Sequence, residues 1–156
     1  MSSPTDLIAE PDAVVLDLDA ETGDGAVRAL HARLSEVSDA VVDPPELLRQ
    51  LKERMLLAPV CIADDVALPH ARTDAVSRIV IAVGRTRHPI RFDAAHPAVQ
   101  LLFLMGTPKD VVTGYLQAVA ALARFLRTPG TRAGLYSATD ETEFRALLSG
   151  GVAARR

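Results

Sequence analysis

The sequence has little of several features that define common protein classes. Its 156 residues include one cysteine, Cys61, no tryptophan, and an aromatic fraction of only 4%. A single cysteine excludes an intramolecular disulfide framework. A nucleic-acid surface usually needs clustered Lys and Arg side chains and aromatic rings for stacking, and this chain has neither. We therefore expect no nucleic-acid partner.

The chain also lacks a hydrophobic segment long enough to cross a membrane. Its most apolar long stretch, residues 111–126, contains Gln117 and Arg124 and is shorter than the roughly 20 residues of a membrane-spanning helix. Residues 1–12 carry acidic side chains and no apolar core, so they do not resemble a signal peptide. These absences predict a cytoplasmic protein.

What remains is the composition of an ordinary globular domain. The hydrophobic fraction is 49%, the charged fraction is 24% and the formal net charge is -3. A chain of this length buries roughly 68–70% of its unfolded surface, so it needs no metal or disulfide to complete a core. We predict one domain over residues 12–149, a loose N-terminal arm over residues 1–11 and a C-terminal tail over residues 150–156.

The spacing of apolar residues predicts alternating strands and helices. Short apolar runs rich in β-branched residues indicate strands, and apolar residues three and four positions apart indicate helices. We predict strands over residues 13–18, 66–68, 78–83 and 99–105, and helices over about 27–37, 45–57, 108–128, 131–136 and 140–148. This alternation predicts an α/β fold, in which helices flank both faces of a sheet.

The predicted fourth helix carries a clear start signal. Thr107, Pro108 and Asp110 fit the N-cap, first and third positions of a capping box. Its predicted apolar face consists of Val112, Tyr115, Leu116, Val119, Ala123 and Leu126. Pro129-Gly130 is expected to end this helix.

The side chains best suited to catalysis lie in one segment, residues 53–72, with the sequence ERMLLAPVCIADDVALPHAR. His70 follows a short apolar strand, and a neutral imidazole nitrogen there can act as a nucleophile that holds a covalent intermediate. Phosphoryl transfer needs little more than positioning and cationic groups, which Arg54 and Arg72 can provide. The residues alone also fit a simpler interpretation, in which His70 is a histidine of a surface turn.

The segment Ala67-Leu68-Pro69-His70-Ala71-Arg72-Thr73 resembles the active-site signature of a known protein family. The family comprises the fructose/mannitol-type IIA domains of the bacterial phosphotransferase system, including the nitrogen-regulatory IIA proteins. Arg54 stands sixteen residues before His70, which is the spacing between this family's active-site arginine and histidine.

Other parts of the chain resemble the family in the same order. Pro89-Ile90-Arg91-Phe92 is similar to a family segment that follows a strand, and residues 99–108 are similar to the central strand and the turn after it. The resemblance covers about Val14 to Leu148. It implies a single-domain α/β sandwich with a mixed, mostly parallel sheet.

The resemblance also implies an activity. His70 would accept a phosphoryl group from the phosphocarrier protein HPr and pass it to a IIB domain, which phosphorylates a sugar during import. Regulatory members instead use the phosphohistidine as a signal to a target protein, and a lone IIA domain favours that branch. We expect no metal or organic cofactor and, at most, peripheral contact with a membrane transporter. The alternative is a non-catalytic regulatory binding module that retains the IIA fold.

The sequence departs from the family pattern near the expected site. The glycines that usually precede the histidine are missing from residues 59–65, which include Asp64 and Asp65. This acidic pair would repel a phosphate and favour protonated His70, unless it is only a solvated turn.

Two further departures concern side chains next to the phosphate. Tyr115 occupies the place of the family's second histidine; its hydroxyl can donate a hydrogen bond but carries no positive charge. It also fits a simple core position on a helix. Met55 follows Arg54, where the family often has Glu.

The remaining histidines and the cysteine give weaker signals. We predict His31 on a polar helix face and His88 and His96 in loops, with no spacing that suggests a metal site. Cys61 is expected to be a small buried hydrophobic residue rather than a reactive thiol.

Overall fold

The computed structural model describes residues 10–127 and 130–153, which fall into two compact units. The predicted arm over residues 1–11 and the end of the predicted tail therefore lie mostly outside the described residues. The first unit, Asp12–Lys109, contains β1 (Ala13–Leu18), α2 (Gly23–Val37), α3 (Pro44–Leu57), β2 (Cys61–Ala63), β3 (Val66–Ala67), β4 (His70–Arg72), β5 (Val80–Ile90) and β6 (Val99–Thr107). The second contains α4 (Val112–Arg127), α5 (Thr131–Ser137) and α6 (Glu141–Ala153).

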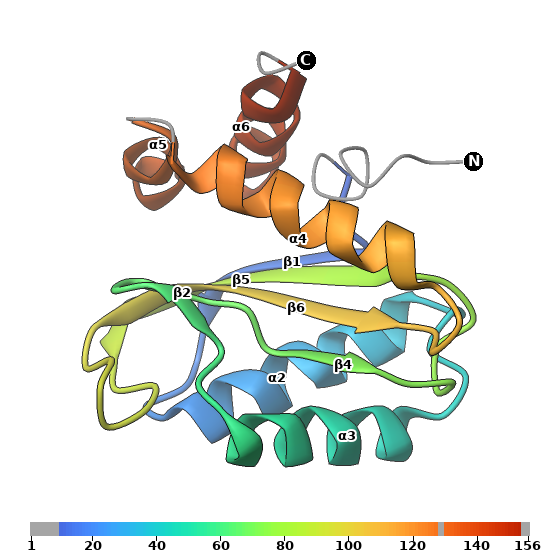
Figure 1. The fold of residues 1–156 in the computed structure, drawn as a ribbon. Helices are drawn as coiled ribbons and strands as arrows, with labels where there is room; N and C mark the ends of the chain where they lie inside the picture. The colour runs from blue at the N-terminus through green and yellow to red at the C-terminus, as the bar shows by residue number, and fades with distance from the viewer. Residues whose placement is uncertain (1–9, 128–129, 154–156) are drawn as a thin grey trace. The chain divides into compact units, whose positions relative to one another are not determined.

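The strands of the first unit form one mixed sheet of six strands (Figure 1). Its order is β1-β5-β6-β3-β2, and β4 also pairs with β6. Three pairs of strands are parallel: β1 with β5, β3 with β6 and β4 with β6. Two pairs are antiparallel: β5 with β6 and β2 with β3. The predicted α/β class and the mixed, mostly parallel sheet are thus confirmed.

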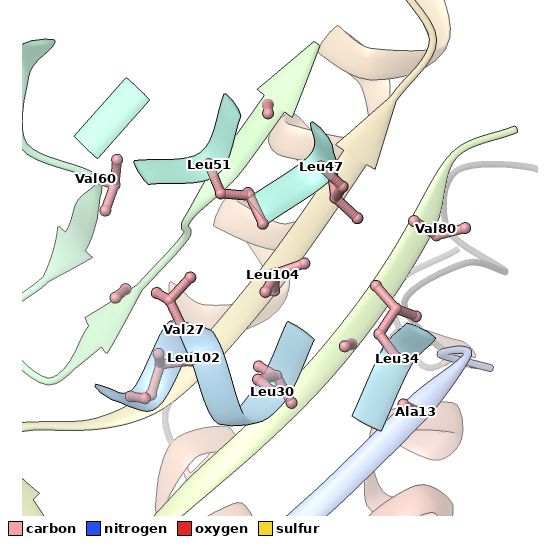
Figure 2. Packing of buried hydrophobic residues seen from close by; sticks show 14 of the residues in the cluster. Ala13, Val27, Leu30, Leu34, Leu47, Leu51, Val60, Val80, Leu102 and Leu104 are labelled. Atoms are coloured by element: carbon pink, nitrogen blue, oxygen red, sulfur yellow. The ribbon is translucent and has the colours of Figure 1, made fainter. Parts of the chain in front are cut away.

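Helices α2 and α3 pack on the same face of this sheet (Figure 1). Each begins with a side-chain cap: the Thr22 hydroxyl accepts a hydrogen bond from the Gly25 amide, and the Asp43 carboxylate accepts one from the Glu46 amide. The core between helices and sheet includes Val27, Leu30, Leu34, Leu47, Leu51, Val80, Leu102 and Leu104 (Figure 2). Val37, predicted on the apolar side of α2, is 45% exposed.

The capping box predicted at Thr107 is wrong. β6 continues through Thr107, and α4 begins only at Val112. Long-range pairing explains the difference, because Gly106 pairs with Val80 of β5 on one side and with Ala71 of β4 on the other. Hydrogen bonds and burial within the sheet therefore outweigh the local preference of Thr107 and Pro108 for a helix start.

The helices of the second unit follow the predicted order but differ in detail. The buried residues of α4 are Ala118, Ala121, Leu122, Phe125 and Leu126. Val112 and Leu116, predicted on the buried face, are 48% and 59% exposed. Pro129 lies outside the described residues, and α6 continues beyond its predicted end, through the glycine pair, to Ala153. No helix in the described part of the chain is long and apolar enough to cross a membrane.

The packing of α3 gives a first testable prediction. Leu51 is fully buried in the core, whereas Leu56 on the same helix is 87% exposed. We expect Leu51→Ala to lower the free energy of unfolding by about 2–5 kcal/mol, because it removes buried methyl groups and leaves a cavity. Leu56→Ala should change it by no more than about 0.5 kcal/mol. Urea unfolding of both variants checks this, and equal effects would contradict the observed packing.

Candidate functional site

His70 is the first residue of β4, a short strand paired in parallel with β6. It lies opposite Met105, whose amide donates a hydrogen bond to the Pro69 carbonyl at 2.9 Å. Leu68 and Pro69 are buried, whereas His70 is half-buried. The imidazole therefore projects from a fixed backbone and still reaches the surface.

The backbone also fixes the protonation pattern of the His70 ring. Nδ1 lies 2.8 Å from the Leu68 carbonyl oxygen. A carbonyl only accepts hydrogen bonds, so Nδ1 must carry the hydrogen. In the neutral ring the lone pair then belongs to Nε2, which is the nucleophilic nitrogen.

Burial lowers the pKa of His70 below its ordinary value of 6.5. The hydrogen bond to the Leu68 carbonyl opposes this effect, and the nearby positive charge of Arg54 adds to it. This direction is opposite to the one expected from Asp64 and Asp65. His70 is thus mainly neutral at neutral pH, as a nucleophile must be.

Arg54 reaches this site from the last turn of α3, which packs against β4. Its Nη1 donates a hydrogen bond to the Ala58 carbonyl at 3.2 Å, so the guanidinium lies at the C-terminal end of the helix. Its positive charge adds to the effect of burial in lowering the pKa of His70. The structure therefore brings together two residues that the sequence pattern paired.

Arg72 shares the short strand β4 with His70. Ala71 between them belongs to the buried core, and side chains alternate along a strand, so His70 and Arg72 project to the opposite side. Arg72 is exposed, and its Nη2 donates a hydrogen bond to the Lys109 carbonyl at 2.6 Å. The Lys109 amide in turn donates to the Asp74 carboxylate at 3.2 Å, which ties the ends of β4 and β6 together.

Comparison with known proteins identifies the family of this chain. Residues 7–150 match the family described as "Phosphoenolpyruvate-dependent sugar phosphotransferase system, EIIA 2". The chain belongs to this family. A solved structure of the nitrogen regulatory protein IIA-Ntr from Neisseria meningitidis has 25% identity and a TM-score of 0.75, and the match covers 91% of this chain and 99% of the other. The IIA fold predicted from the sequence is thereby confirmed.

Two relatives of this IIA domain have assigned systems. The fructose-specific EIIA component of Haloferax volcanii is 32% identical over 130 residues, which cover 82% of this chain and 83% of that protein. The 2-O-alpha-mannosyl-D-glycerate-specific EIIABC component of Escherichia coli is 27% identical over 140 residues, or 88% of this chain. This IIA domain spans only 21% of that relative, whose name joins IIA to IIB and IIC parts.

Tyr115 belongs to α4 in the second unit of this IIA domain and is half-buried. Its role beside the phosphoryl group stays a prediction, and so do the individual roles of His70, Arg54 and Arg72. The Leu68 carbonyl is a feature that the side-chain pattern did not show. Its one sequence signal was Pro69, which holds the preceding residue extended.

Two of the other histidine predictions are wrong. His31 was expected on a polar face but is only 7% exposed, and its Nε2 lies 2.8 Å from the Pro44 carbonyl at the start of α3. Burial lowers the pKa of His31, partly offset by that hydrogen bond. His88 was expected in a loop but lies on β5, where it is exposed. His96, as expected, lies in the connection between β5 and β6.

Cys61 lies on β2 and is half-buried. Burial raises the pKa of its thiol to about 12, and the neighbouring Asp93 carboxylate adds to this effect. The thiol is therefore protonated at neutral pH and a weak nucleophile, in agreement with the expectation that Cys61 is not a reactive cysteine.

The electrostatic contact between Arg54 and His70 gives a prediction that needs no partner protein. Arg54→Ala should raise the pKa of His70, because the guanidinium destabilises the imidazolium form. NMR titration of the histidine ring protons measures this. The matched control is Arg49→Ala on the same helix, whose charge is paired with Glu46 and Glu53. A pKa of His70 that does not respond to Arg54→Ala, or responds equally to both variants, would contradict the site geometry.

Proposed function

We propose that this IIA domain carries a phosphoryl group on Nε2 of His70. It accepts the group from an HPr-like phosphocarrier protein and passes it to a IIB domain or presents it to a regulated target protein. One observation carries the proposal: the Leu68 carbonyl, 2.8 Å from Nδ1, selects the tautomer in which Nε2 is the nucleophile.

The transfer step balances in electrons and charge. The Nε2 lone pair attacks the phosphorus atom, and the bond from phosphorus to the donor's histidine breaks, so its electron pair returns to the donor ring. The His70 ring gains positive charge when Nε2 bonds to phosphorus. The hydrogen bond from Nδ1 to the Leu68 carbonyl then becomes charge-assisted, which stabilises the phosphorylated ring.

The arginines stabilise the charge on the transferred group. Arg54 supplies a cation close enough to act on the imidazole, and its planar fork suits two phosphoryl oxygens. Arg72 projects from the same side of β4 as His70 and can turn from the Lys109 carbonyl toward a third oxygen.

A binding module that retains the IIA fold is the second candidate. The observations that favour it are Tyr115, which lacks a positive charge, and the acidic residues Asp64 and Asp65 between β2 and β3. In such a module His70 would keep its structural place but never hold a phosphoryl group.

Incubation with phosphoenolpyruvate, enzyme I and HPr separates the two candidates. We expect the chain to gain one phosphoryl group that is labile in acid and stable in base, which intact-protein mass spectrometry and pH-dependent release detect. A chain that stays unmodified while circular dichroism shows an intact fold would instead be a binding module. Transfer of the label to an added IIB domain would favour transport, and retention would favour signalling.

A further inference from the structure

Three side chains with metal-binding atoms meet at a place that has no part in the phosphoryl-transfer step proposed above. Cys61 lies on β2, whereas Asp93 and His96 lie in the connection between β5 and β6. One ligand atom from each of these half-buried residues lies within 4.8 Å of the other two. The Cys61 sulfur is 3.9 Å from Oδ2 of Asp93, and Nδ1 of His96 is 2.7 Å from Oδ1 of Asp93.

The backbone holds these donors in place. The Phe92 amide donates to the His96 carbonyl at 3.0 Å, and the His96 amide donates to the Asp93 carbonyl at 3.2 Å. The Ala95 amide donates to Oδ1 of Asp93 at 2.9 Å. Phe92 is buried in the core, so the connection is fixed at its start. Binding of an ion would therefore cost little conformational entropy, because the backbone that carries these side chains is already ordered.

We propose that Cys61, Asp93 and His96 form a binding site for a divalent cation of the zinc class. Sulfur, imidazole nitrogen and carboxylate oxygen are the donors that zinc takes, at about 2.3, 2.0–2.1 and 2.0–2.2 Å. Such distances place tetrahedral ligands roughly 3.3–3.8 Å apart. The sulfur of Cys61 is already 3.9 Å from Oδ2 of Asp93, whereas Nδ1 of His96 and Oδ1 of Asp93, at 2.7 Å, must move apart to admit the ion. One thiolate and one carboxylate balance the two charges of the ion, and the imidazole stays neutral.

The binding step is a simple exchange. The Cys61 S–H bond breaks, its proton goes to the buffer, and a metal–sulfur bond forms. The Asp93 carboxylate accepts a hydrogen bond from Nδ1 of His96, so the ring must first lose that Nδ1 hydrogen to solvent and take one up at Nε2. The Nδ1 lone pair then binds the ion. The hydrogen bond between His96 and Asp93 is thereby replaced by shared coordination of the ion.

A surface cleft adjoins the site at one of its three ligands. Asp93 also lines a surface cleft together with Lys52, Met55, Pro59 and Val60. A water or a small anionic ligand can reach the ion from this cleft, as in an open zinc site. β2 is the last strand in the order of the sheet, so the ion would tie this edge strand to the β5–β6 connection.

Cobalt titration of the metal-free full chain tests the proposal. We expect one equivalent of Co²⁺ to bind with a thiolate-to-cobalt charge-transfer absorption, and zinc to displace it. Cys61→Ser should remove this absorption, and both Cys61→Ser and His96→Gln should weaken binding at least about tenfold. His88→Gln, at an exposed histidine on β5, is the matched control and should bind like the wild type. Equal binding by the wild type and Cys61→Ser would overturn the assignment.

A second measurement uses only the wild-type chain and so does not depend on the folding of a variant. Zinc should slow modification of Cys61 by a thiol reagent, and a chelator should restore the rate. At a concentration about 100 times its Kd, zinc should also raise Tm by about 5–10 °C. If zinc changes neither the thiol reactivity nor Tm, the three side chains are a hydrogen-bonded cluster and not a metal site.

Discussion

His70→Ala is expected to abolish phosphorylation by phosphoenolpyruvate, enzyme I and HPr. The substitution removes the atom that we propose forms the phosphorus–nitrogen bond, and no other side chain of β4 is nucleophilic. We expect at least a thousandfold loss of transfer, because covalent catalysis has no alternative route once the nucleophile is absent. The fold should remain intact, since His70 is half-buried and Nδ1 of its ring lies 2.8 Å from the carbonyl of Leu68, only two residues away in the sequence.

The matched control for this loss is His88→Ala, which removes an exposed histidine from another strand of the same unit. It should be phosphorylated at the wild-type rate. Intact-protein mass spectrometry over a time course follows both variants. Phosphorylation that persists in His70→Ala, with the group on His31, His88 or His96, would show that the site is assigned to the wrong residue.

Arg54→Lys is expected to slow phosphoryl transfer about ten- to a hundredfold. A lysine keeps the positive charge but replaces a planar fork with a single ammonium group, so it loses one charge-assisted hydrogen bond to the phosphoryl oxygens. Such a bond is worth about 1.5–3 kcal/mol in the transition state, which corresponds to that change in rate. Arg54→Ala should be at least as slow, because it loses the charge as well.

Arg49→Lys on the same helix provides the matched control. Arg49 pairs with Glu46 and Glu53 at 2.6 and 2.8 Å and has no place in the proposed site. Its substitution should leave the transfer rate within about twofold. Rapid-quench measurements with excess phosphorylated HPr give the rates. Unchanged transfer rates in both Arg54 variants would show that Arg54 has no role in phosphoryl transfer.

The sequence predicted the parts of the fold that local patterns determine. The apolar run at residues 13–18 became β1 with the same bounds, and Pro45 correctly marked the first turn of α3. Long-range pairing decided the rest. β4 has three residues and exists because His70–Arg72 pair with Met105–Thr107, a contact that no local pattern contains.

The candidate site likewise has features that the sequence predicted and features that only the fold revealed. The spacing of Arg54 and His70 was visible in the sequence, because a family signature records it. The role of the Leu68 carbonyl could not be predicted from the sequence, since every residue has a backbone carbonyl and no residue type marks this one. The cluster of Cys61, Asp93 and His96 was missed for a similar reason: the fold brings β2 next to the β5–β6 connection, and only this approach joins residues 32 positions apart.

The most direct test of the account is to identify the phosphorylated nitrogen. NMR of ¹⁵N-histidine-labelled, phosphorylated protein distinguishes the two ring nitrogens of His70 by their coupling to phosphorus and their chemical shifts. We predict phosphate on Nε2 and a hydrogen retained on Nδ1, in its bond to the Leu68 carbonyl. Phosphate on Nδ1, or on any histidine other than His70, would contradict it.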